Sequence, residues 1–202
     1  MIKSIVFDVG DVLADFCYED YLRNLGFREV LVRFFTEHIV LTDFWHQMDM
    51  GEKSIADGRR EFIELYPQYI DEINLFWDRV EEIVEEYDYS EDLVKDLKNQ
   101  GYGIYILSNY PKELAEMQWP KFKFLKYADG KIISAYEHLT KPDEKIFRLL
   151  EERFDIDLNE CLFIDDRQIN VDAAERLGMT TILFKGYNDL NAKLNKLGIR
   201  LY

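Results

Sequence analysis

The stretch that decides the fold spans residues 5–15 and reads IVFDVGDVLAD. Its first three residues form a continuous apolar run, which is typical of a strand buried on both faces of a sheet. The run stops at Asp8, and two more acids, Asp11 and Asp15, follow in the same stretch. The pattern therefore predicts a strand over residues 3–8 that ends in a loop of carboxylates.

The pattern beyond this loop predicts an α/β fold. Apolar residues recur at helical spacing from about residue 16 to 89, which predicts about four helices. Strands and helices then alternate, and such alternation favours a Rossmann-like parallel sheet with helices on both faces. We expect a core of residues 1–14 and 90–202 and an inserted helical cap of residues 15–89. The later strands are expected over 103–108, 131–134, 161–165 and 180–184, and the helices over 90–101 (capped by Ser90), 111–118, 143–154, 168–177 and 188–197.

Composition narrows the kinds of partner. The 202 residues include 25 Lys and Arg against 40 Asp and Glu, a formal charge of −15, which argues against nucleic-acid and membrane partners. Cys17 and Cys161 lack metal-binding spacing and are expected to be reduced thiols. The chain starts directly with the first strand, and no stretch approaches a membrane span. We expect a cytoplasmic protein that is a monomer or a weak dimer.

Polar side chains lie at the ends of three predicted strands and before one predicted helix. Asp8 ends the first strand, Ser108 and Asn109 end the strand at 103–108, and an Asp165–Asp166 pair ends the strand at 161–165. Lys141 precedes the helix that begins at Pro142. Taken singly, each is explained by turn chemistry or by solvation. Because ligands bind at the carboxyl ends of parallel strands, all of them are expected to face one crevice.

Four motifs resemble those of the haloacid dehalogenase-like hydrolases, and the resemblance covers nearly the whole chain. The motifs are FDVGDVLAD (7–15), ILSN (106–109), LTKPDEKIF (139–147) and FIDDRQINVDAAERLGM (163–179). The helical insertion resembles the first cap class of that family. Within the family, the first motif is most similar to that of small bacterial sugar-phosphate phosphatases such as alpha-D-glucose-1-phosphate phosphatase.

The resemblance implies a Mg²⁺-dependent phosphatase that acts on a small phosphorylated metabolite. Such an enzyme forms an aspartyl-phosphate, and Mg²⁺ neutralises the two anions that must meet. The resemblance assigns the nucleophile to Asp8 and the charge-balancing cation to Lys141. It also implies phosphate binding by Ser108, Asn109 and Lys141, metal ligands Asp8, Gly10, Asp166 and Asp165, and a water-orienting Asn170.

The chain departs from the family pattern at two positions of the first motif. Gly10 stands where the family usually has a second aspartate, which protonates the leaving group. Val12 stands where the family usually has a threonine. General acid–base catalysis is typically worth about 10² to 10⁴ in rate. The candidate replacements are Asp11, Asp15 and His138, each of which also has a structural explanation.

Two other functions remain open. A non-catalytic or regulatory binding protein on the same fold would explain the missing acid. A haloacid dehalogenase needs neither that acid nor a metal, but the Asp165–Asp166 pair speaks against it. In the cap, the aromatic residues Phe16, Tyr18, Phe44 and Trp45 are candidate substrate contacts, although apolar stripes are more often core.

Overall fold

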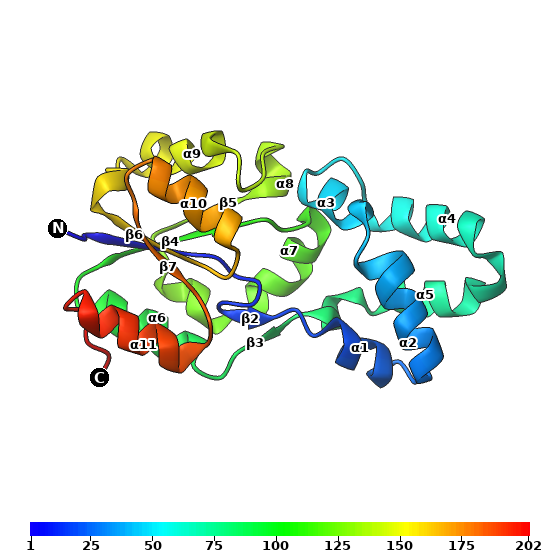
Figure 1. Ribbon diagram of the computed structural model, residues 1–202. Helices are drawn as coiled ribbons and strands as arrows, with labels where there is room; N and C mark the ends of the chain where they lie inside the picture. The colour runs from blue at the N-terminus through cyan, green and yellow to red at the C-terminus, as the bar shows by residue number, and fades with distance from the viewer.

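The fold is built on a five-stranded sheet in which all neighbouring strands are parallel (Figure 1). The computed structural model describes residues 1–202. The expected α/β class with a parallel sheet is confirmed. In spatial order the strands are β5 (Gly130–Ile133), β4 (Gly103–Ser108), β1 (Ser4–Phe7), β6 (Cys161–Asp165) and β7 (Thr180–Leu183).

Helices cover both faces of the sheet, because its strands are apolar on both sides. Alternate residues of β1 belong to two different hydrophobic clusters, as the two-residue period of a strand requires. The cluster that contains Val6 includes α9 (Glu144–Phe154) and α10 (Gln168–Arg176). The other cluster includes α6 (Ser90–Asn99) and α11 (Tyr187–Lys196).

The helical cap lies beside the sheet, on the right of Figure 1, where the ribbon runs from blue through cyan. It contains five α-helices and not the expected four, because Gly26, with a φ of +85°, interrupts an apolar pattern that looks continuous in the sequence. The helices are α1 (Tyr18–Asn24), α2 (Glu29–Phe35), α3 (Asp43–Asp49), α4 (Ile55–Leu65) and α5 (Ile70–Asp78). A π-helical turn, η1 (Thr36–Val40), and two 3₁₀ turns, η2 (Pro67–Tyr69) and η3 (Val80–Ile83), connect them.

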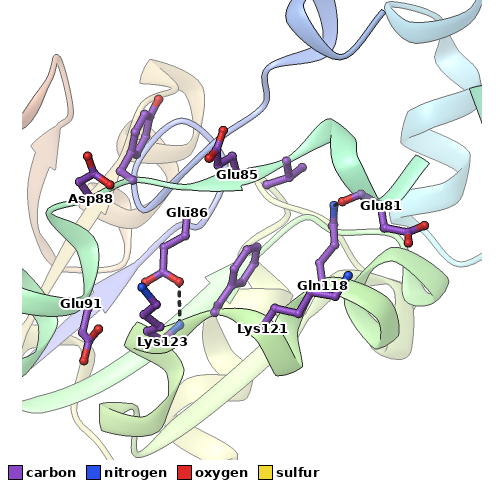
Figure 2. Close-up of a pocket in the computed structure, with 11 residues that line it drawn as sticks. Glu81, Glu85, Glu86, Asp88, Glu91, Gln118, Lys121 and Lys123 are labelled. Carbon is purple, nitrogen blue, oxygen red and sulfur yellow. Dashed lines mark hydrogen bonds between the residues drawn. The ribbon is translucent and has the colours of Figure 1, made fainter. Parts of the chain in front are cut away.

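A two-stranded antiparallel ribbon joins the cap to the sheet domain. It pairs β2 (Ala14–Asp15) with β3 (Glu85–Glu86), and no such pair was expected because strands of two residues leave no sequence pattern. The Glu86 carboxylate accepts hydrogen bonds from the backbone N–H groups of Lys123 (2.7 Å) and Phe124 (3.3 Å). Figure 2 shows the first of these contacts, which anchors the returning strand to the core.

The prediction that Ser90 caps α6 is wrong. Ser90 is the first residue of the helix and not its cap: Tyr89 occupies the N-cap position, and its side chain makes no capping bond. The Ser90 hydroxyl instead donates to the carbonyl of Leu13 (2.7 Å), and the Tyr89 hydroxyl donates to the carbonyl of Val12 (2.6 Å). These two bonds tie the helix after the cap to the loop after β1.

The remaining elements are short. The helix expected over 111–118 is α7 (Lys112–Gln118), with Pro111 at its N-cap. None of the helices combines the length and the apolar character needed to cross a membrane. The elements that were not expected are α8 (Ser134–Glu137) and the 3₁₀ turns η4 (Trp119–Lys121), η5 (Lys123–Tyr127) and η6 (Leu158–Glu160).

The larger hydrophobic cluster joins the cap to the sheet domain. Its 41 buried residues include Ile5 and Phe7 of β1 and also Phe76 and Trp77 of α5. The predicted division into a core of residues 1–14 and 90–202 and a cap of residues 15–89 therefore stays a prediction. The two parts share one hydrophobic cluster.

The centre of the cap gives a stability prediction. Phe76→Ala should lower the free energy of unfolding by about 3–5 kcal/mol. The reason is that the fully buried ring contacts the rings of Tyr21, Phe35 and Trp77. Urea unfolding measures the change. Leu75→Ala, at a site 37% exposed on the same helix, is the matched control. Equal losses in the two variants would contradict this account of the cap core.

Candidate active site

Seven of the expected catalytic, phosphate-binding and metal-site residues, Asp11 and Asn170 among them, line one cavity at the edge of the sheet where the strands end. Asp8 follows β1, Asn109 follows β4, and Asp166 follows β6. Together with Gly10 and Lys141 they line a cavity of about 620 Å³ between the sheet and the cap. The parallel topology brings these residues together, because the carboxyl ends of neighbouring strands meet at the same edge.

The ammonium group of Lys141 lies between two carboxylates. Its Nζ is 2.8 Å from Oδ2 of Asp8 and 2.7 Å from Oδ2 of Asp165, and only 1% of the lysine side chain is exposed. Asn109 holds the backbone of Lys141: its Oδ1 accepts from the lysine N–H (2.8 Å), and its Nδ2 donates to the lysine carbonyl (3.0 Å). One buried positive charge is thus fixed at the end of β1.

Asp165 is oriented by donors from its own side of the sheet. Its carboxylate accepts from the backbone N–H of Arg167 (2.9 Å) and from Nδ2 of Asn170 (3.0 and 3.1 Å). With the lysine contact, both of its oxygens are engaged inside the protein, and its exposed fraction is 0%. Asp165 therefore helps to position Lys141 and Asn170.

Three carboxylates surround the single ammonium group, so the site carries excess negative charge. Burial raises the pKa of Asp8 to about 8, against the effect of Lys141 and with a further contribution from Asp165. Burial, followed by the charges of Asp165 and Asp11, raises the pKa of Asp166 to about 6. Burial also acts to raise the pKa of Asp165, but the Lys141 ammonium holds it below its usual range. A further cation would relieve this excess.

The same residues fit a divalent cation. Carboxylate oxygens of Asp8, Asp165 and Asp166 all lie within 4.8 Å of one another. Asn170 lines the cavity from α10, and its buried Oδ1 has no hydrogen-bond partner. Carboxylate and amide oxygens are the ligands that Mg²⁺ prefers. The donor set therefore suits a hard cation, and Asn170 has an acceptor left to orient a water molecule beside it.

The loop after β1 contains Gly10 and Asp11. A Cβ added at Gly10 would meet no atom within 4 Å, so crowding does not require glycine there. Asp11 has a φ of +55° and lines the cavity. Its Oδ1 accepts from the backbone N–H of Phe16 (3.3 Å), and burial raises its pKa. The Asp11 carboxylate is thus partly committed to holding its own loop.

Four other expected site residues, Asp165 among them, are not part of the cavity lining. Asp15 lies in the ribbon, opposite Glu85. His138 is exposed, ends α8 with a φ of +54°, and places its Nδ1 2.9 Å from the carbonyl oxygen of Met50. Ser108 is fully buried, and its hydroxyl makes one weak contact of 3.5 Å with the carbonyl of Asn109.

The cap closes the cavity with both apolar and polar side chains. Phe16 and Trp45 line it, with ring centroids 5.6 Å apart, and the buried Nε1 of Trp45 has no hydrogen-bond partner. Tyr18 lies outside the lining, as does Phe44, whose ring packs against Phe62 and Trp77.

Asp49 is a charged cavity residue that sequence reasoning missed, as it missed Thr42 and Ile169. It is the last residue of α3, and its carboxylate makes no hydrogen bond or ion pair within the protein. Burial raises its pKa to about 7, against the charges of Lys141 and Arg167. A signal was present in the sequence: an acid in the last turn of a helix opposes the helix dipole, so it requires a reason other than helix stability.

Comparison with protein families gives a match over most of the chain. A family model described as haloacid dehalogenase-like hydrolase matches residues 2–178. The matched range contains every residue that lines the cavity.

Two curated proteins are similar to part of the chain. A sesquiterpene phosphatase from Aspergillus oryzae is 34% identical over 93 residues, which are 43% of this chain and 44% of that protein. A flavin mononucleotide hydrolase from Arabidopsis thaliana is 27% identical over 114 residues, 56% of this chain and 46% of that protein. The chain therefore matches less than half the length of either relative.

Among solved structures, a haloacid dehalogenase family enzyme from Bacteroides thetaiotaomicron is similar along its whole length. One structure has a TM-score of 0.71 and 25% identity over 96% of this chain and 98% of that enzyme. A second structure of that enzyme, in complex with magnesium and inorganic phosphate, has a TM-score of 0.67 and 26% identity over 92% and 95%. The fold, the cavity and the family match together show that the protein belongs to the haloacid dehalogenase-like hydrolases.

Proposed function

We propose that the protein is a Mg²⁺-dependent phosphatase that hydrolyses a small phosphorylated metabolite through an aspartyl-phosphate on Asp8. The observation that carries the proposal is the Asp8 carboxylate, which lines the cavity 2.8 Å from the Lys141 ammonium and forms a cluster with the carboxylates of Asp165 and Asp166. The names of the two curated relatives and the magnesium and phosphate bound by the Bacteroides enzyme support it.

Asp8 is oriented for nucleophilic attack on phosphorus. Its Oδ1 accepts a hydrogen bond from the backbone N–H of Val9 (2.7 Å), and its Oδ2 contacts Lys141. A carboxylate in this role splits ester hydrolysis into formation and breakdown of an acyl-phosphate. A magnesium ion held by Asp8, the Gly10 carbonyl, Asp166 and the nearby Asp165 would supply the positive charge that two reacting anions need.

Lys141 is the proposed main contact to the phosphoryl oxygens. An ammonium group has three N–H donors, and two of them point to Asp8 and Asp165, which leaves one for a phosphoryl oxygen. Both polar atoms of the Asn109 side chain bind the Lys141 backbone, so Asn109 would contribute its main-chain N–H. Ser108 would contribute its hydroxyl, since its present contact at 3.5 Å is weak.

A sugar phosphate is the substrate class that we place first. The cavity wall combines aromatic faces from Phe16 and Trp45 with polar groups from Thr42, His46 and Asp49. A sugar ring offers apolar faces and hydroxyl groups in a similar mixture. An ester at the anomeric oxygen also has a better leaving group than a simple alkyl phosphate, which suits a chain with glycine at position 10.

The alternatives are separated by one set of assays. A phosphatase releases inorganic phosphate from a panel of sugar and nucleotide phosphates, and it does so faster with Mg²⁺. A haloacid dehalogenase releases halide in excess chelator. A protein that binds phosphate esters without turning any of them over is a non-catalytic binder, as the missing acid at Gly10 would allow.

Asp8→Asn should lower phosphate release by at least about 10³-fold, because an amide oxygen is a far weaker nucleophile than a carboxylate. The loss is measured as kcat/KM on the best substrate of the panel. Asp43→Asn, which changes an exposed acid on α3, should retain activity and serves as the control. Turnover in Asp8→Asn close to that of the wild type would exclude the proposed nucleophile.

Mg²⁺ should stabilise the folded protein. At 100 times its dissociation constant it adds about 2.7 kcal/mol to the free energy of unfolding, measured by urea titration. The gain should shrink as the pH falls below about 8 and further below about 6, because Asp8, whose pKa is raised to about 8, and Asp166, whose pKa is raised to about 6, must then each lose a proton to bind. Asp166→Asn should abolish most of the gain. A gain that is equal at pH 7.5 and pH 5 would contradict this metal site.

A further inference from the structure

The proposed reaction needs a proton donor that the first motif does not supply. When Asp8 attacks phosphorus in line, the leaving oxygen lies on the opposite side of the phosphoryl group, away from β1. An alkoxide leaving group requires a proton at this point. The donor must therefore reach the cap side of the cavity, and Gly10 has no side chain with which to do so.

The three donors expected from the sequence are poorly placed for this task. Asp11 accepts a hydrogen bond from the N–H of Phe16 in its own loop. Asp15 and His138 are not among the residues that line the cavity. His46 does line it, but its side chain is exposed to solvent.

Asp49 is better placed than any of these. It lines the cavity from the cap, at the C-terminal end of α3. Its carboxylate is close enough to the Lys141 ammonium for that charge to act on it, and Lys141 in turn contacts Asp8. No group of the protein makes a hydrogen bond or an ion pair with the two carboxylate oxygens of Asp49, so both are available to a ligand.

Contacts between the cap and α8 fix the position of Asp49. The Ser134 hydroxyl donates to the Asp49 carbonyl (2.6 Å) and accepts from the backbone N–H of Tyr110 (2.9 Å), which lies in the loop after β4. Nδ1 of His138 lies 2.9 Å from the next carbonyl oxygen along the chain. The following residue, Gly51, packs so closely on the Ala135 carbonyl that a Cβ would not fit. The end of α3 is therefore docked on the core.

We propose that Asp49 is the general acid of the reaction, supplied by the cap in place of the acid missing at position 10; this inference rests on the phosphatase function proposed above. As Asp8 bonds to phosphorus and the ester P–O bond breaks, the Asp49 carboxyl gives its proton to the leaving oxygen, and a neutral alcohol departs. The Asp49 carboxylate then takes a proton from the water that attacks the aspartyl-phosphate. Inorganic phosphate leaves, and Asp8 and the acid are restored.

The protonation state of Asp49 supports this role. A general acid is most effective when its pKa lies near the working pH. Because burial raises the pKa of Asp49 to about 7, a large share of molecules carries the proton at neutral pH. The groups that act against this rise are the cations of Lys141 and Arg167, both on the core side.

The test compares two aryl phosphates whose leaving groups differ in their need for a proton. Phenyl phosphate releases a strongly basic phenolate, whereas 4-nitrophenyl phosphate releases a stable anion. Asp49→Asn should lower kcat/KM by about 10²-fold for phenyl phosphate and by less than about 10-fold for 4-nitrophenyl phosphate. Asp43→Asn on the same helix is the matched control and should lower neither.

A second variant gives a rescue experiment. Position 10 has room for a side chain, and its φ lies outside the left-handed region, so Gly10→Asp can place the usual family acid there. The double variant Gly10→Asp, Asp49→Asn should recover activity on phenyl phosphate relative to Asp49→Asn alone.

The outcomes separate this inference from the proposed function. A wild-type protein that turns over neither of these aryl phosphates nor any sugar or nucleotide phosphate of the panel fails the phosphatase proposal itself. If the wild type is active and Asp8→Asn is not, an equal loss on both substrates in Asp49→Asn overturns the role of Asp49 alone. A loss specific to phenyl phosphate in Asp11→Asn or His46→Gln, but not in Asp49→Asn, would also overturn it.

Discussion

The buried ammonium group of Lys141 is the interaction on which the rest of the site depends. Without it, Asp8 and Asp165 would be two carboxylates in apolar surroundings with no compensating charge, which is strongly destabilising. Asn109 fixes the lysine backbone, and Asn170 fixes Asp165, so the charge pattern is rigid before any ligand arrives. One cation among three carboxylates leaves an excess of negative charge, and a divalent ion is the simplest way to remove it.

The sheet and its polar edge could be predicted from the sequence because their signals are local. The apolar run before Asp8 and the run before Asp165 each specify a buried strand, and parallel topology then brings their ends together. The elements that were missed give weak local signals. The ribbon strands are two residues long, and Gly26 breaks a helix that the apolar pattern alone would continue. Ser90 was predicted to cap a helix because serine is common at that position. Its actual bond to the carbonyl of Leu13 could not be predicted, since it joins positions far apart in the sequence.

The site was more predictable on the core side than on the cap side, where Phe16 and Trp45 were expected at the cavity and Asp49 was not. Core residues follow strands, so their direction is set by the sheet. A cap residue reaches the cavity only through the packing of one helix end on α8, and no spacing in the sequence reports that contact. Asp49 and His138 show the difference. Asp49 was overlooked at the end of a short helix, and His138, on the core side, was considered as an acid although its Nδ1 lies 2.9 Å from the backbone carbonyl of Met50.

The ribbon between cap and core links the cap to the loop after β1, which contains Gly10. Ala14 of β2 bridges to Gly10, and its carbonyl accepts from the N–H of Asp11 (2.7 Å). A rotation of the cap about the ribbon would therefore change the backbone torsions at Gly10, whose carbonyl is a proposed cation ligand. Cation binding and cap position are then two equilibria that share one segment, and thermodynamic linkage makes their coupling reciprocal. A substrate that favours the docked cap would increase the affinity for the cation, and the cation would favour the docked cap by the same free energy.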